Sequence, residues 1–101
     1  ANPKNSPLVL TIATLFKYFL NLLTYHYQKK STPNAQEMAR LLGINSFFMK
    51  DYTDGARMYN AVKCAGIISL LREYDMKSKG VGNVNSSDGE LLKELVFKIM
   101  H

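Results

Sequence analysis

The chain has 101 residues, of which 47% are apolar and 21% charged, with a formal net charge of +5 at pH 7. This length predicts one domain, residues 1–101, and the composition excludes an intrinsically disordered chain. A single cysteine, Cys64, excludes an internal disulfide and fits a cytoplasmic protein. The basic residues are spread along the chain, which favours a solvated basic surface over a phosphate-binding patch.

The first predicted helix begins at Ser6-Pro7, a cap followed by proline, and runs to about Lys30. Residues 8–23 are so apolar that a membrane span is one interpretation. Lys17 interrupts the run, however, and the uninterrupted apolar length is shorter than the roughly 20 residues that a bilayer needs. We expect no membrane partner. Burial on several sides, within the domain and against a neighbouring subunit, explains the helix better.

Three further helices are predicted between residues 34 and 79. The first of them runs from an Asn34 cap to Gly43, the next from Asn45 to about Tyr59, and the third from Asn60 to about Lys79. Helical spacing selects their apolar positions. These are Met38, Leu41, Leu42, Phe47, Phe48, Met49, Tyr52, Ala56, Cys64, Ile67, Ile68, Leu71 and Tyr74.

The last predicted helix begins at Ser87, where S-D-G-E forms a capping box with Glu90. Its apolar face is expected to consist of Leu91, Leu92, Leu95, Val96 and Ile99. Before it, Lys79 and Gly80 mark the end of the preceding helix, and Asp75 lies one turn before Lys79, where the two can form an ion pair. With no convincing strand, the sequence predicts an all-α, five-helix bundle.

Residues 39–52 carry the A-x-x-x-G spacing of a DNA-binding helix-turn-helix, with Ala39 at the close helix contact and Gly43 at the turn. The second helix of this motif would present Asp51 and Asp54 to the phosphates, which repel carboxylates. We therefore favour a helical hairpin inside a bundle. A helix-turn-helix DNA-binding regulator is the alternative function.

No reaction centre is predicted. His26 and His101 are not spaced with Cys64 or a carboxylate as metal ligands would be, and the G-x-x-x-x-G-K-[ST] motif of nucleotide hydrolysis does not occur. We expect no catalytic residue, metal or cofactor. Aromatic residues that could lie between core and surface are the candidate subunit-interface residues. They are Phe16, Tyr18, Tyr25, Tyr27, Phe48 and Tyr52.

The segment LLREYDMKSKGVGN, residues 70–83, and the following DGELLKELVFKIMH, residues 88–101, resemble the extreme C-terminus of the delta subunit of bacterial DNA polymerase III, of the Bacteroidetes type. NPKNSPLVLTIATLFKYFLNLLTYHY and INSFFMKDY are similar to the first and third helices of the same domain. The matching positions near the C-terminus are Leu71, Asp75, Lys77, Lys79, Gly80, Glu90, Leu91, Leu92 and Leu95.

This resemblance implies a clamp-loader collar domain, the C-terminal part of a longer protein, as the missing initiator methionine also indicates. In that family, collar domains of the tau/gamma, delta and delta-prime types form a ring that assembles the loader of the sliding clamp. The clamp would be contacted through an N-terminal domain absent here, and DNA only indirectly. The resemblance implies no catalysis in this fragment, although the holoenzyme is a DNA polymerase. It also implies that Asp75 anchors the connector after Gly80.

Overall fold

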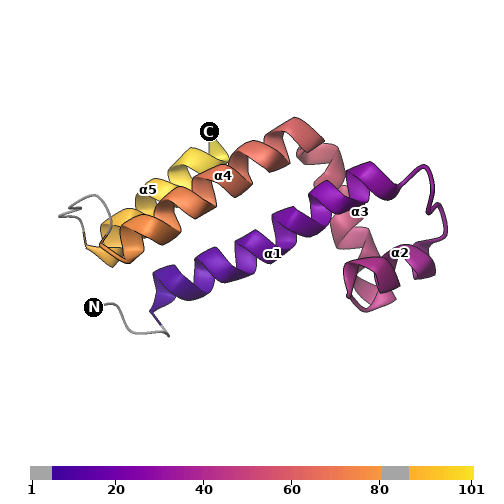
Figure 1. Cartoon of the computed structure of the whole chain (residues 1–101), viewed down its shortest axis with the longest axis horizontal. Helices are drawn as coiled ribbons and strands as arrows, with labels where there is room; N and C mark the ends of the chain where they lie inside the picture. The colour runs from indigo at the N-terminus through magenta and orange to yellow at the C-terminus, as the bar shows by residue number, and fades with distance from the viewer. Residues whose placement is uncertain (1–5, 81–86) are drawn as a thin grey trace. The chain divides into compact units, whose positions relative to one another are not determined.

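The computed structural model describes residues 6–80 and 87–101 (Figure 1). These residues form five α-helices and one short 3-10 helix, and no strand occurs among them. The all-α prediction is therefore confirmed. In chain order the elements are α1 (Pro7–Gln28), α2 (Ala35–Leu42), η1 (Ser46–Phe48), α3 (Met49–Met58), α4 (Ala61–Ser78) and α5 (Asp88–Met100).

The chain divides into two compact units, and α1 and α4 contribute to both. The terminal unit comprises Ala1–Lys17 and Ile67–His101. The middle unit comprises Tyr18–Gly66, and so contains the second half of α1, all of α2, η1 and α3, and the start of α4. The prediction of one domain stays a prediction.

The predicted helix starts are found where short polar side chains accept backbone N–H groups. The Ser6 hydroxyl accepts the N–H of Val9 at 3.2 Å, and Asn60 Oδ1 accepts that of Lys63 at 2.8 Å. Each bond satisfies one of the first-turn donors that have no partner within the helix. At α3 the prediction was less accurate, because η1 precedes the α-helix and α3 begins at Met49.

The capping box of α5 is present in both directions. Glu90 donates its N–H to the Ser87 hydroxyl at 3.2 Å, and the Glu90 carboxylate accepts the Ser87 N–H at 3.1 Å. The pKa of the Glu90 carboxyl group is lowered, and the main cause is the hydrogen bond from the backbone N–H of Ser87. The negative charge thus lies at the positive end of the helix dipole.

The core of the middle unit lies where α2 packs near the start of α3. Met38, Ala39, Leu42 and Met49 form a buried cluster, against which Tyr25, Ile44 and Tyr52 pack. Three of the apolar positions predicted for these helices are exposed, namely Leu41, Phe47 and Phe48. Helical spacing identifies apolar positions, but it does not determine which of them a neighbouring element covers.

The buried apolar residues of the terminal unit come from α1, α4 and α5. They are Leu8, Ile12, Ile67, Ile68, Leu71, Tyr74, Leu91, Leu95 and Ile99. The inward face predicted for α4 is confirmed, whereas the face predicted for α5 was too wide. Leu92 is only partly buried and Val96 is 44% exposed.

Candidate interaction surfaces

The one thiol is placed for packing and not for chemistry. Cys64 is fully buried and its Sγ donates to the backbone carbonyl of Tyr59 at 3.5 Å. Burial raises the pKa of this thiol, so the reactive thiolate is disfavoured. Within the described ranges, no three histidine, cysteine or acidic side chains gather as metal ligands.

One histidine contacts a backbone carbonyl and the other an aromatic ring. His26 Nε2 lies 2.7 Å from the carbonyl oxygen of Tyr59. The ring of His101 stacks on that of Phe97, with centroids 4.4 Å apart. Neither contact joins a histidine to a nucleophile or a carboxylate, so the geometry offers no acid–base pair at these positions.

The α2–η1–α3 hairpin has the local geometry that its glycine spacing predicts. Gly43 adopts a φ of 70°, the left-handed conformation that ends α2. The N–H of Ile44 then donates to the Ala39 carbonyl at 2.9 Å. Ala39, expected at the close helix contact, is buried, and Met49 at the start of α3 is buried as well. The turn is therefore compatible with both interpretations of this segment, a bundle hairpin and a helix-turn-helix.

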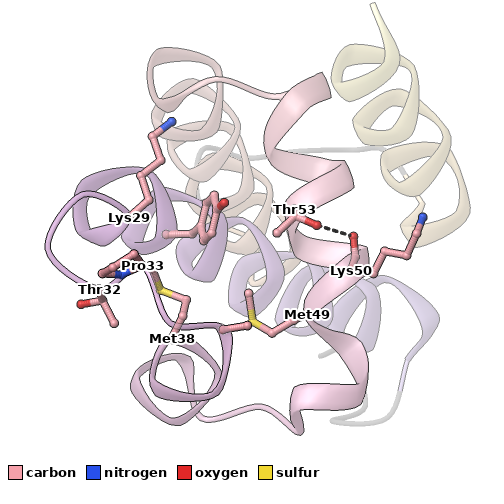
Figure 2. A pocket seen from close by; sticks show the side chains of 9 residues that line it. Lys29, Thr32, Pro33, Met38, Met49, Lys50 and Thr53 are labelled. Atoms are coloured by element: carbon pink, nitrogen blue, oxygen red, sulfur yellow. Dashed lines mark hydrogen bonds between the residues drawn. The ribbon is translucent and has the colours of Figure 1, made fainter.

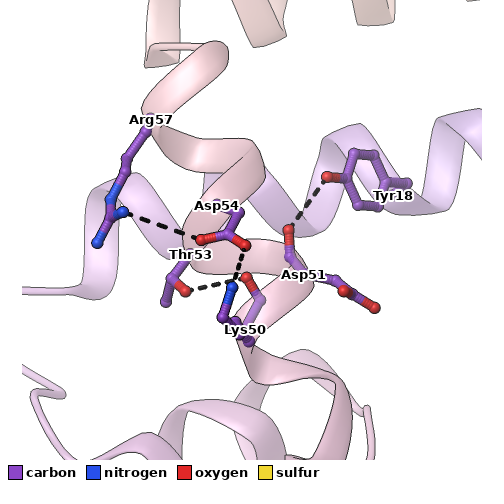
Figure 3. A network of polar contacts seen from close by, with 6 residues as sticks. All are labelled: Tyr18, Lys50, Asp51, Thr53, Asp54 and Arg57. Atoms are coloured by element: carbon purple, nitrogen blue, oxygen red, sulfur yellow. Dashed lines mark hydrogen bonds and ion pairs between the residues drawn. The ribbon is translucent and has the colours of Figure 1, made fainter.

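On the exposed side of α3, two cationic side chains pair with the carboxylate of Asp54 (Figure 3). Lys50 Nζ lies 2.8 Å from Asp54 Oδ2, and Arg57 lies 4.0 Å from the other oxygen. The Lys50 hydrogen bond lowers the pKa of Asp54, and the same bond raises the pKa of Lys50. Because Asp54 partly neutralises both cations, α3 presents little free positive charge to a phosphate backbone.

A pocket of about 280 Å³ opens in the middle unit beside this network. Figure 2 shows the Met38 and Met49 side chains facing it, while the ammonium groups of Lys29 and Lys50 point away from the two methionines. The pocket is thus apolar, and no set of charged groups converges on it. It is lined by Tyr25, Lys29, Thr32, Pro33, Ala35, Met38, Met49, Lys50 and Thr53.

In the terminal unit, α1 and α4 border a groove of about 410 Å³. Phe16 is half-buried there, and the Arg72 guanidinium lies 5.9 Å from the centre of its ring. Leu10 and Ala13 add exposed apolar surface on the same helix. The groove is lined by Val9, Ile12, Ala13, Phe16, Leu71, Arg72 and Asp75.

The outward side of α5 is a second apolar surface of the terminal unit. Phe97 and Met100 are 63% and 68% exposed, and a shallow groove of about 470 Å³ runs along this side. The helix is therefore apolar on two sides, one buried and one exposed. In the sequence, the wide spread of apolar residues around this helix was the signal that could have indicated the exposed apolar side. The groove is lined by Leu92, Lys93, Val96, Phe97, Met100 and His101.

The six predicted interface residues have different surroundings. Tyr18 and Tyr52 lie together in the middle unit, with ring centroids 5.1 Å apart, and Tyr25 packs on the same core as Tyr52. The Tyr18 hydroxyl donates to the backbone carbonyl of Asp51. The pKa of Tyr18 is raised, and burial is the main cause. Phe16 lines the α1–α4 groove, whereas Tyr27 and Phe48 are exposed.

The predicted Asp75–Lys79 contact is an exposed i,i+4 ion pair of 3.0 Å. Such a surface pair contributes about 0.3–0.5 kcal/mol. Gly80 has a φ of 81°, in keeping with its place at the helix end. Residues 81–86 lie outside the described part of the chain, and with them most of the connector that Asp75 was expected to anchor. That role stays a prediction.

The sequence did not reveal a polar contact between α4 and α5. Tyr74 is fully buried, and its hydroxyl donates to the Glu94 carboxylate. The ammonium groups of Lys77 and Lys98 lie 4.5 and 5.2 Å from the centre of the Tyr74 ring. Tyr74 thus receives cation–π contacts from both helices while its hydroxyl reaches across.

Helix α1 is long and apolar enough to cross a membrane by length and composition alone. Only 22% of the residues in its most apolar window are buried within the chain. Burial within the chain therefore fully covers only a minority of the residues in this window. The function of the chain therefore depends on what covers the rest of the apolar surface of α1.

No protein-family model matches the chain, and no match was found among the curated proteins or the solved structures. The case for a function consequently rests on the surfaces described above and on the resemblance of the sequence.

Proposed function

We propose that this chain is an assembly domain, the collar domain of a clamp-loader delta subunit of bacterial DNA polymerase III. Its role would be to pack helix against helix with the collar domains of tau/gamma and delta-prime type subunits. The observation that carries this proposal is the apolar surface of α1, since only 22% of the residues in its most apolar window are fully buried within the chain. An extended apolar surface of this kind is typical of a partner interface.

The α1–α4 groove of the terminal unit is the best-defined part of that surface. Phe16 lies in it as a half-buried aromatic ring beside Arg72, and these are residue types that dominate interface energies. Leu10 is 51% exposed on the same helix. A partner helix placed here would remove these side chains from water.

A membrane would also cover an apolar helix, but α1 is poorly suited to one. Lys17 is exposed near the middle of the helix. A lysine at the centre of a membrane-spanning helix costs roughly 3 kcal/mol. At a subunit interface, the same side chain can extend its ammonium group into water.

The test is co-elution of the chain with collar domains of the other clamp-loader subunits, with mass measured by light scattering. The proposal expects a mixed complex with the wild-type chain. Leu10→Ser should weaken this complex, because it places a hydroxyl group on the apolar surface of α1 that the partner would cover. Val62→Ser is the matched control, since Val62 is 82% exposed and lies on α4 in the middle unit. Equal complexes with both variants would contradict the role of the α1 surface.

A DNA-binding helix-turn-helix is the second candidate, and the left-handed turn at Gly43 with the buried Ala39 favours it. Its test is a shift of duplex DNA on titration with the chain. Binding through lysine and arginine would weaken steeply as salt rises. The pairing of Lys50 and Arg57 with Asp54 supports the assembly function over this one.

A further inference from the structure

We propose that the exposed Phe47–Phe48 pair of one copy of this chain binds the outward groove of α5 on a second copy. The inference concerns self-association through Phe47–Phe48 and the α5 groove, whereas the collar proposal rests on the surface of α1, so the two are tested independently. Both surfaces lack a partner in the described chain, and each carries a charge that suits the other.

The donor surface is the tip of the α2–α3 hairpin. Phe47 is 82% exposed and Phe48 50% exposed, and their rings meet edge to face with centroids 5.4 Å apart. Two adjacent phenylalanines on a short 3-10 helix present a rigid apolar projection, because few torsions must be fixed on binding. Exposed aromatic anchors of this kind are the side chains that contribute most to protein–protein affinity.

The acceptor surface is the α5 groove. Val96 and Met100 lie one turn apart on the helix, with Phe97 beside them, and the groove of about 470 Å³ lies over these apolar side chains. It is shallow and open to solvent, and although His101 stacks on the Phe97 ring, a projecting ring can reach Val96 and Met100. The methionine adapts to the shape of an incoming aromatic ring and makes a favourable sulfur–aromatic contact.

The flanking charges are opposite at corresponding positions. Asp51 follows Phe47 by four residues, at the start of α3, and its carboxylate forms no ion pair within the described ranges. Lys93 precedes Phe97 by one turn and likewise has no ion-pair partner there. An aromatic anchor with an adjacent acid therefore meets an apolar groove with an adjacent base, which favours one orientation of docking.

The contact joins two different surfaces, so it is heterologous. A pair of copies therefore keeps one free acceptor groove on the copy that supplied its tip, and one free donor tip on the other. This property gives a decisive test with the 101-residue chain alone. Phe47→Ser disables the tip and Phe97→Ser disables the groove. Both side chains are largely exposed, so the fold should persist, and circular dichroism verifies it. Val62→Ser is the control, because Val62 is as exposed as Phe47 but lies on neither surface.

Sedimentation equilibrium over a range of concentrations measures the outcome. Wild type and Val62→Ser should self-associate, and each phenylalanine variant alone should show a dissociation constant raised by about tenfold or more. A mixture of the two variants should form a one-to-one dimer, because one intact tip then meets one intact groove. Asp51→Lys and Lys93→Glu should each weaken association, and the double variant should regain it.

Three results would overturn the inference. The wild-type chain could stay monomeric up to millimolar concentration. The two phenylalanine variants could assemble as wild type does. Their mixture could remain monomeric although the wild type associates, which would indicate a symmetric contact. None of these results bears on complexes with other collar domains, so the two proposals are tested separately.

Discussion

Tyr74 on α4 donates the hydrogen of its buried hydroxyl to the Glu94 carboxylate on α5. The contact joins residues 20 apart in the chain. It links the C-terminal helix to the rest of the terminal unit through a polar bond as well as through apolar packing. Its removal should therefore loosen α5 specifically.

Tyr74→Phe should lower the free energy of unfolding by about 1 kcal/mol, because one buried hydroxyl bond is lost while the ring is kept. Thermal unfolding measures the effect as a fall in Tm. Tyr27→Phe is the control, since Tyr27 is 70% exposed. An unchanged Tm for Tyr74→Phe would show that the bond contributes nothing to stability.

The same contact should make stability depend on pH. The Tyr74 hydroxyl, and then Lys98, lower the pKa of Glu94 below its ordinary value of 4.5. A carboxyl group with a lowered folded-state pKa stabilises the protein above its unfolded pKa, and this stabilisation disappears as the pH falls through the folded value.

The measurement is the Tm difference between wild type and Glu94→Gln as the pH is lowered from neutral. The difference should be greatest above pH 4.5 and should shrink below it. In the Tyr74→Phe background, the effect of Glu94→Gln above pH 4.5 should be smaller, because the two residues interact directly. Equal effects in both backgrounds would contradict the coupling.

The capping residues and the inward face of α4 could be predicted from sequence, because both depend on local chemistry and helical period. Asn34, Gly43 and Ser87 act as expected. The exposure of Phe47 and Phe97 could not be predicted, because it depends on which helices face each other. Hydrophobicity indicates that a residue prefers burial, but it does not supply the neighbour that buries it.

Two helical glycines should respond in opposite ways to alanine. At Gly55 on α3, an added methyl group would overlap the Tyr18 hydroxyl, so Gly55→Ala should destabilise the middle unit. At Gly66 on α4, nothing lies within 4 Å of an added Cβ. Gly66→Ala should therefore stabilise the chain by about 0.5–1 kcal/mol, as the substitution does in helices. Chemical denaturation of both variants tests this, and a stabilising Gly55→Ala would contradict the tight packing at Tyr18.

The buried thiol should be unreactive in the folded chain. Because burial both shields Cys64 and raises its pKa, labelling by a thiol reagent should be slower than in the unfolded chain by on the order of tenfold or more. Mass spectrometry of labelled samples with and without denaturant gives the ratio. Equal rates would mean that this part of the middle unit opens readily.

The measurement that tests the central claim most directly is the mass of the chain mixed with the other collar domains, and with duplex DNA, at low and at moderate salt. Assembly through the apolar surface of α1 predicts a mixed protein complex that persists as salt rises, and no comparable complex with DNA. The assembly function would be contradicted if the chain formed no complex with the collar domains but bound duplex DNA tightly at low salt and dissociated from it at moderate salt.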